Sequence, residues 1–175
     1  MNDLGLTHFD KNGNAIMVDI SGKETSARCA IAKGNISVNS ETLTAVQNGT
    51  AKKGDVLGAA RIAGISAVKR TAELIPLCHP LIFDSCKVDF NINEEKQQIE
   101  AVCTVKLSGK TGAEMEALTG VSIALLTIYD MCKAIDKKMV ISDVRLWDKT
   151  KSFNHEPHKL HEQSEQILKE QGYVG

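Results

Sequence analysis

The spacing of apolar residues changes along this chain in an orderly way. Residues 14–21 and 28–38 are rich in aliphatic side chains and are expected to be extended, and Ser40 is placed to cap a short helix that ends before Gly49. Residues 54–75 then carry apolar side chains three and four positions apart, which is typical of one face of a helix. The first part of the chain is therefore predicted to pass from strand to helix.

A hairpin, a second long helix and a last strand follow. Residues 85–92 and 99–107 alternate between apolar and polar side chains and are joined by a polar loop, which predicts a β-hairpin. Residues 112–135 carry apolar side chains along one helical face, and residues 138–147 supply another strand. The order strand, helix, strand, strand, helix, strand predicts an α+β fold of the ferredoxin-like type, with helices packed on one face of an antiparallel sheet.

The alternation of apolar and polar residues ends near residue 152, and the chain beyond it is mostly polar and charged. We expect residues 1–152 to form a single ferredoxin-like domain and residues 153–175 a polar C-terminal tail, either mobile or folded as a short surface helix. Several predicted strands are apolar on both faces, as in "IMVDI" and "AVCTV". A sheet covered by helices on one face alone does not need this, so we expect a homo-oligomer that buries the second face.

The charge, the apolar runs and the cysteines of the chain argue against several classes of binding partner. Lys and Arg total 21 against 22 Asp and Glu, so the chain has no overall basic field for nucleic acid or an anionic membrane. The N-terminus lacks the pattern of a secretory signal, and no apolar run approaches the roughly 20 residues of a membrane span. The five cysteines include no C-x-x-C pair, which argues against a disulfide framework or a zinc ribbon. We expect a cytoplasmic protein with reduced thiols and no bound metal.

The stretch "LIPLCHPL" places Cys78 and His79 between two prolines, which predicts an irregular corner. Neighbouring residues of an extended segment point to opposite sides, so this pair is poorly arranged as a nucleophile and its base. No second Cys or His lies nearby at the spacing of a metal site. Two interpretations stay open: a buried structural pair, or a corner from which His79 donates to an oxyanion or a phosphate.

The segment "GKTG" precedes the second long helix. It lacks the upstream glycine of a nucleotide-binding P-loop and is not predicted to be one. A tight turn into a helix N-terminus can face an anion, but Glu114 and Glu116 in the first turn are equally well explained as favourable partners of the helix dipole. Spacing alone does not decide between these interpretations.

Three further charged residues have both a plain and a functional interpretation. Asp130 and Lys133 are three positions apart on one helical face, as in an ordinary surface ion pair. The helix around them is apolar, so partial burial would shift both pKa values and make them a candidate acid and base. Lys53 precedes a helix, where it is either solvated or a phosphate contact.

Taken together, the motifs resemble a known family. "MVDIS", "KGDV", "LIPLCHPL", "GKTGAEMEALT" and "IYDMCKA" follow in the order and spacing of the cyclic pyranopterin monophosphate synthase family, over residues 8–150. The resemblance implies that a cyclic dihydro-guanosine triphosphate, made from GTP by a radical enzyme, is converted into cyclic pyranopterin monophosphate with release of diphosphate. This is a step of molybdenum cofactor biosynthesis. A homohexamer built as a trimer of dimers, and handover of substrate from the radical enzyme, are also implied.

The resemblance assigns roles residue by residue. The implied catalytic residues are Asp130, Lys133 and Lys53. The implied substrate-binding residues are Asp19, Arg28, Cys78, His79, Glu114, Glu116 and Lys149. No metal ligand is among them, and the expected ion is at most Mg²⁺ that arrives with the substrate triphosphate. Opening and reclosing a purine-derived ring requires proton transfers, and loss of diphosphate requires nearby cations, so these residue types fit the implied chemistry.

The chain departs from the family after its last strand. The family continues with a glycine-rich segment that contains a lysine, where this chain has "DKTKSFNHEPHKLHEQ". Lys149 and Lys151 are both candidates for the lysine role. His155, His158 and His161 are three residues apart and are explained either by a solvated tail or by adventitious metal binding. A sensor that binds the same ligand without turnover, or a purely structural assembly protein, are the alternative functions.

Overall fold

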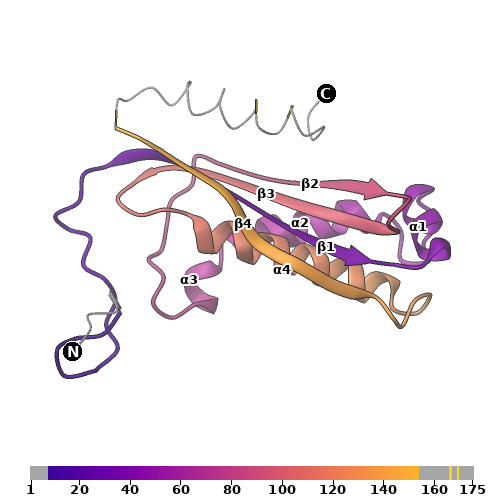
Figure 1. Ribbon diagram of the computed structural model, residues 1–175, viewed down its shortest axis with the longest axis horizontal. Coiled ribbons are helices and arrows are strands. Elements are labelled where there is room, and N and C mark those ends of the chain that lie inside the picture. Colours follow the sequence, from indigo (N-terminus) through magenta and orange to yellow (C-terminus); the bar gives the residue numbers. More distant parts are fainter. Residues whose placement is uncertain (1–7, 154–165, 167–168, 170–175) are drawn as a thin grey trace.

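The computed structural model describes residues 8–153 together with Gln166 and Lys169. Its centre is a four-stranded antiparallel sheet with the strand order β2-β3-β1-β4 (Figure 1). The strands are β1 (Ser26–Ser37), β2 (Ser85–Asn93), β3 (Gln98–Gly109) and β4 (Val140–Ser152). The helices are α1 (Ser40–Gln47), α2 (Val56–Val68), α3 (Thr71–Leu74) and α4 (Glu114–Cys132). Both long helices, α2 and α4, lie on one face of the sheet, which confirms the predicted ferredoxin-like fold (Figure 1).

Alternation along the strands decides which side chains meet the helices. On β1, Ala30, Ala32 and Ile36 belong to the main buried cluster, which also contains the buried face of α4. Ile36 pairs with the buried Ile99 on β3. The residues between them on the strands point to the other face, where a smaller cluster of Cys29, Ile31 and Val102 is also buried. Both faces of the central strands therefore carry buried apolar side chains, as the sequence pattern predicted, and the second face also buries Lys33 and Thr104.

The apolar composition of α4 comes from its place in the core. By length and composition alone this helix could cross a membrane. Its residues Gly120, Val121, Leu125 and Ile128 are buried within the domain, and the helix packs on β1, β3, β4 and α2. The core helix of a globular domain has the same composition, so α4 is explained without a membrane.

Two predicted elements differ from the structure. The helix expected over residues 54–75 is divided, because Arg70 leaves the helical region (φ −111°, ψ 8°) and the Thr71 hydroxyl donates to the Val68 carbonyl (3.1 Å). Residues 14–21 join no strand of the sheet, and one isolated bridge pairs Phe9 with Ala15. Residues 8–25 form an N-terminal arm. Strand β1 is paired with β3 on one side and β4 on the other, so the aliphatic run of this arm cannot pair with β1.

Smaller differences concern element ends. The side chain of Asn39, rather than of Ser40, caps α1 by accepting from the amide of Thr42 (2.8 Å). Strand β4 extends beyond the predicted end at residue 147 because its polar continuation pairs with β1 as far as Ser152. The predicted tail, residues 153–175, lies outside the described residues apart from Phe153, Gln166 and Lys169, and it stays a prediction.

The helices α2 and α4 meet through a glycine. A Cβ atom on Gly64 would lie 2.9 Å from the carbonyl oxygen of Gly120, closer than real contacts allow. We expect Gly64→Val to lower the free energy of unfolding by about 2 to 3 kcal/mol, because the two helices must separate. Ser66→Val, at an exposed site of the same helix, controls for the helix propensity of valine. Urea unfolding measures both variants, and equal losses would contradict the proposed tight contact.

Candidate functional site

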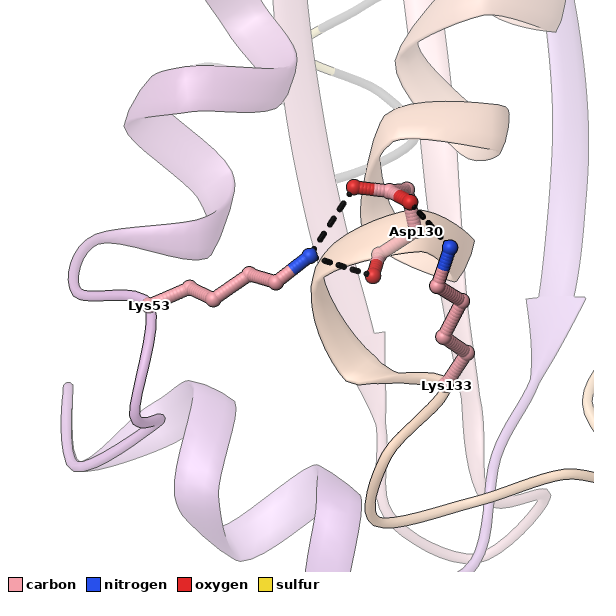
Figure 2. Close-up of polar contacts among 3 residues, drawn as sticks. All are labelled: Lys53, Asp130 and Lys133. Atoms are coloured by element: carbon pink, nitrogen blue, oxygen red, sulfur yellow. Dashed lines mark hydrogen bonds and ion pairs between the residues drawn. The ribbon is translucent and has the colours of Figure 1, made fainter.

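Three charged side chains meet at the end of α4: Asp130 and Lys133, which are neighbours on the helix, and Lys53, which is distant in sequence (Figure 2). The Lys53 ammonium donates to the carboxylate of Asp130 (3.0 Å to Oδ2) and to its backbone carbonyl (3.0 Å). Lys133 donates to the other carboxylate oxygen, Oδ1 (2.6 Å). One carboxylate is thus held between two ammonium groups. This cluster contains all three of the residues predicted to be catalytic.

The loop before α2 sets the position of Lys53. The amide of Gly54 donates to the Ala51 carbonyl (2.8 Å), which closes a turn around this lysine. Gly54 has φ +84°, a conformation that favours glycine. The carboxylate of Asp55 then caps α2 by accepting from the Gly58 amide (2.8 Å). The turn at Gly54 and the cap at Asp55 therefore direct Lys53 toward the last turn of α4.

Ion pairing, and not burial, controls the charges of this cluster. The side chains are 48 to 58% exposed, so the hypothesis of partial burial is wrong. The hydrogen bond from Lys133 and then that from Lys53 lower the pKa of Asp130. The hydrogen bond to Asp130 raises the pKa of Lys133. Both groups are therefore held in their charged forms at neutral pH.

A second group of candidates lines a pocket at the opposite end of α4. The pocket has a volume of about 250 Å³. Cys78, His79, Glu114 and Glu116 line it, and residues of the N-terminal arm close another side. The structure thus brings together four of the residues predicted to bind substrate.

The corner that carries Cys78 is a proline turn. The backbone amide of Cys78 donates to the Ile75 carbonyl (3.0 Å). Pro76 occupies the second position of this turn, where proline is favoured. Cys78 and His79 are partly buried and face the pocket, so the interpretation as a buried structural pair is not supported. Burial, and then the charge of Glu116, raise the pKa of the Cys78 thiol. A thiol held in its neutral form is a poor nucleophile.

The two glutamates in the first turn of α4 differ in environment. Glu116 is 3% exposed, and burial raises its pKa. Glu114 is more exposed and pairs with Lys149 (3.2 Å). The ammonium of Lys151 instead lies 4.0 Å from the ring centroid of Phe153. Of the two candidate lysines of β4, Lys149 is therefore the one that reaches a residue of the pocket.

Arg28 and Asp19 do not line the pocket, and their assignment to substrate binding stays a prediction. The Arg28 guanidinium donates to the carbonyls of Gly109 (3.1 Å) and Lys110 (3.2 Å), so it holds the turn between β3 and α4. The carboxylate of Asp19 accepts from the Ser21 amide (2.8 Å). That hydrogen bond lowers the pKa of Asp19, with Lys110 contributing less. In this structure both side chains organise the backbone around the pocket.

Comparison with known proteins decides the family. The model of the MoaC family matches residues 17–152. The chain belongs to the MoaC family. Two similar proteins, from Clostridium botulinum and Novosphingobium aromaticivorans, are each named cyclic pyranopterin monophosphate synthase. They are 58% identical over 145 residues (83% of this chain and 91% of the relative) and 57% identical over 149 residues (85% and 92%), respectively.

A relative from Clostridium perfringens bears the same name and is 56% identical over 144 residues, or 82% of this chain and 91% of the relative. The family match begins just before Asp19 and ends at Ser152. It therefore includes both the lysine–aspartate cluster and most of the pocket. The family resemblance inferred from the motifs is confirmed.

The two parts of the site are far apart within one MoaC chain. Glu116 lies in the first turn of α4 and Asp130 in its last, and α4 is one continuous helix (Figure 1). At about 1.5 Å of rise per residue, the helix separates these residues by about 21 Å. No substrate atom can therefore contact both residues of the same chain at once.

Sequence reasoning missed the contribution of the N-terminal arm. His8 and Lys23 line the pocket and add basic groups to it, and Lys110 contacts the arm. The aliphatic run of residues 14–21 predicted an extended segment, but this pattern did not indicate that the arm passes beside the Cys78–His79 corner. Family motifs did not indicate these residues either.

No cluster of three or more His, Cys, Asp or Glu side chains suited to a metal ion occurs within the described part of the chain. The three tail histidines, His155, His158 and His161, lie outside that part. Their alternative interpretations, a solvated tail or adventitious metal binding, both stay open.

Proposed function

We propose that this protein converts the cyclic dihydro-guanosine triphosphate into cyclic pyranopterin monophosphate and diphosphate, in molybdenum cofactor biosynthesis. The observation that carries the proposal is the Lys53–Asp130–Lys133 cluster on the fold of the MoaC family. Relatives that are more than 50% identical over most of this chain and are named cyclic pyranopterin monophosphate synthase support it. The protein is accordingly a lyase-type enzyme.

The cluster is suited to proton transfer. Asp130, Lys133 and Lys53 offer one carboxylate and two ammonium groups within hydrogen-bonding distance of one another. Binding of an anionic substrate next to the lysines competes with Asp130 for them and frees a base and an acid together.

The pocket is suited to the triphosphate and the departing diphosphate. His79, Lys23 and the nearby Lys149 supply donors and positive charge close to the buried Glu116. Negative charge that develops as diphosphate leaves is stabilised by fixed donors of this kind. Arg28 holds the adjoining turn, and in the proposed complex it also contributes positive charge.

We further propose a homohexamer, built as a trimer of dimers, in which each active site is shared by two chains. The separation of about 21 Å along α4 supports this, because two α4 helices related by a two-fold axis bring the cluster of one chain near the pocket of the other. Exposed apolar side chains on α2 and α4, Ile62 (69% exposed) and Leu126 (53% exposed), support contacts with further chains.

We propose a cytoplasmic enzyme that receives its substrate from the radical enzyme and binds neither nucleic acid nor membrane. All five cysteines are free thiols, as a reducing compartment favours. The fold is proposed to need no metal, and Mg²⁺ enters at most with the substrate triphosphate. Varying Mg²⁺ in the assay below tests its contribution.

Diphosphate release distinguishes the enzyme from the two alternatives. The purified protein is incubated with the cyclic dihydro-nucleotide, and diphosphate and pterin product are measured together over time. An enzyme forms both in equal amounts over many turnovers. Binding without diphosphate would support the sensor, and neither binding nor diphosphate would support the structural assembly protein.

Lys149 and Lys151 can be separated in the same assay. We expect Lys149→Met to lower kcat/KM by about 10- to 100-fold, because it removes the cation beside Glu114 at the pocket. Lys151→Met is the matched control on the same strand and should stay within about twofold of wild type. Equal losses in the two variants would show that the contact with Glu114 does not decide the lysine role.

A further inference from the structure

The N-terminal arm, residues 8–25, forms one wall of the substrate pocket. His8, Val18, Ile20 and Lys23 of the arm line it. Apart from the Phe9–Ala15 bridge the arm has no regular structure, and it leaves the apolar side chains of Ile16 and Met17 exposed. Ile16 and Met17 therefore do not hold the arm on the domain, which leaves Val18, Ile20 and specific polar contacts to set its position.

One lysine of the body makes such a contact. The Lys110 ammonium donates to the backbone carbonyl of Ser21 at 2.7 Å. Among the described residues, this is the one hydrogen bond between the arm and the rest of the domain that the structure shows. A hydrogen bond from a charged donor is stronger than one between neutral groups.

Both ends of this contact are held in place. On the body side, Arg28 donates to the carbonyls of Gly109 and Lys110, which fixes the turn that carries the lysine. On the arm side, Asp19 accepts from the amide of Ser21, and the Lys23 amide donates to the Ile20 carbonyl (3.1 Å). The contact thus joins two locally ordered turns, and the side chains of Val18 and Ile20 extend from the arm turn into the pocket wall.

We propose that Lys110 is a positioning residue, which holds the N-terminal arm against the pocket and so sets the affinity for substrate. Lys110 does not itself line the pocket, so it acts through the arm residues that do. The effect on substrate rests on the proposed function, whereas the tether itself does not. Loss of the lysine should therefore weaken binding and leave the chemistry at the Lys53–Asp130–Lys133 cluster unchanged.

Two measurements on the full-length protein test the proposal. Hydrogen exchange of the backbone amides of residues 18–23, followed by mass spectrometry without substrate, reports the tether directly. We expect Lys110→Met to speed this exchange about tenfold and to leave α4 unaffected. Steady-state kinetics with the cyclic dihydro-nucleotide should show KM raised about tenfold and kcat within about twofold. Lys110→Arg, which keeps a charged donor, should restore both values to within about threefold.

Lys96→Met is the matched control, since this exposed lysine lies in the turn between β2 and β3. Unchanged exchange in Lys110→Met would overturn the tether. Faster exchange with an unchanged KM would overturn the role in substrate affinity, and a fall in kcat at constant KM would show a direct part in the reaction. If the wild-type protein does not turn over the nucleotide, the proposed function fails, and hydrogen exchange still decides the tether.

Discussion

Lys133→Ala should lose activity by about 10²- to 10⁴-fold and still fold. The lysine caps the C-terminal end of α4 and is 58% exposed, so its removal leaves no cavity and costs little helix propensity. Loss of a positioned acid or base has an effect of this size on rate. Asp130 keeps its contact with Lys53 in the variant, so the carboxylate stays paired. Diphosphate release measures activity, and the melting temperature reports folding.

Lys137→Ala is the control for charge, because this lysine is also exposed and lies just after α4. It should retain wild-type turnover and stability. Near-normal turnover by Lys133→Ala would remove Lys133 from the mechanism, and a large fall in its melting temperature would point to a structural role instead.

Mixing two inactive variants should restore about a quarter of wild-type activity. Glu116→Ala disables the pocket and Lys133→Ala disables the cluster. If each site takes its pocket from one chain and its cluster from the other, a mixed dimer has one intact site out of two. Random reassembly of equal amounts makes half of the dimers mixed, which gives the expected quarter. The two variants are unfolded together and refolded, and activity is compared with that of each variant treated alone.

Mass spectrometry under native conditions must show that mixed dimers have formed. Activity that stays at the level of the separate variants, in a sample that contains mixed dimers, would exclude a site divided in this way. Because Glu116 is buried, the melting temperature of Glu116→Ala is measured first to confirm that it folds.

Elements with a clear period were predictable from sequence because each buries one regular face. The alternation of β2 and β3 and the three-and-four spacing of α4 correspond to side chains that meet the core. The division of the expected long helix was not predictable in this way. The division depends on the backbone conformation of one residue, Arg70. The spacing of apolar residues is the same on both sides of Arg70, so the sequence pattern does not show the break. The aliphatic run of the arm was predicted to be extended, but it pairs with no strand of the sheet, and its path over the pocket was missed.

The sequence predicted which residues belong to the site, but it did not predict how their side chains are arranged. Helix spacing alone placed Lys133 beside Asp130, whereas the approach of Lys53 depends on the loop before α2. The expected burial of the pair failed because Asp130 and Lys133 lie on the exposed face of the last turn of α4, whereas Cys132 in the same turn faces the core and is buried. Lys110 was missed because its partner is a backbone carbonyl, which leaves no mark on residue type.

The continuous helix α4 also fixes the rotational phase between the two parts of the site. Successive residues on an α-helix are turned by about 100°, so one residue inserted between Glu116 and Asp130 would swing the cluster by more than a quarter turn relative to the pocket. The same insertion would carry the buried face of the second half of α4 away from the sheet. Core packing and active-site alignment therefore both require the same number of residues between the two ends of this helix. An insertion within α4 is therefore expected to disrupt the core and the alignment of the site together.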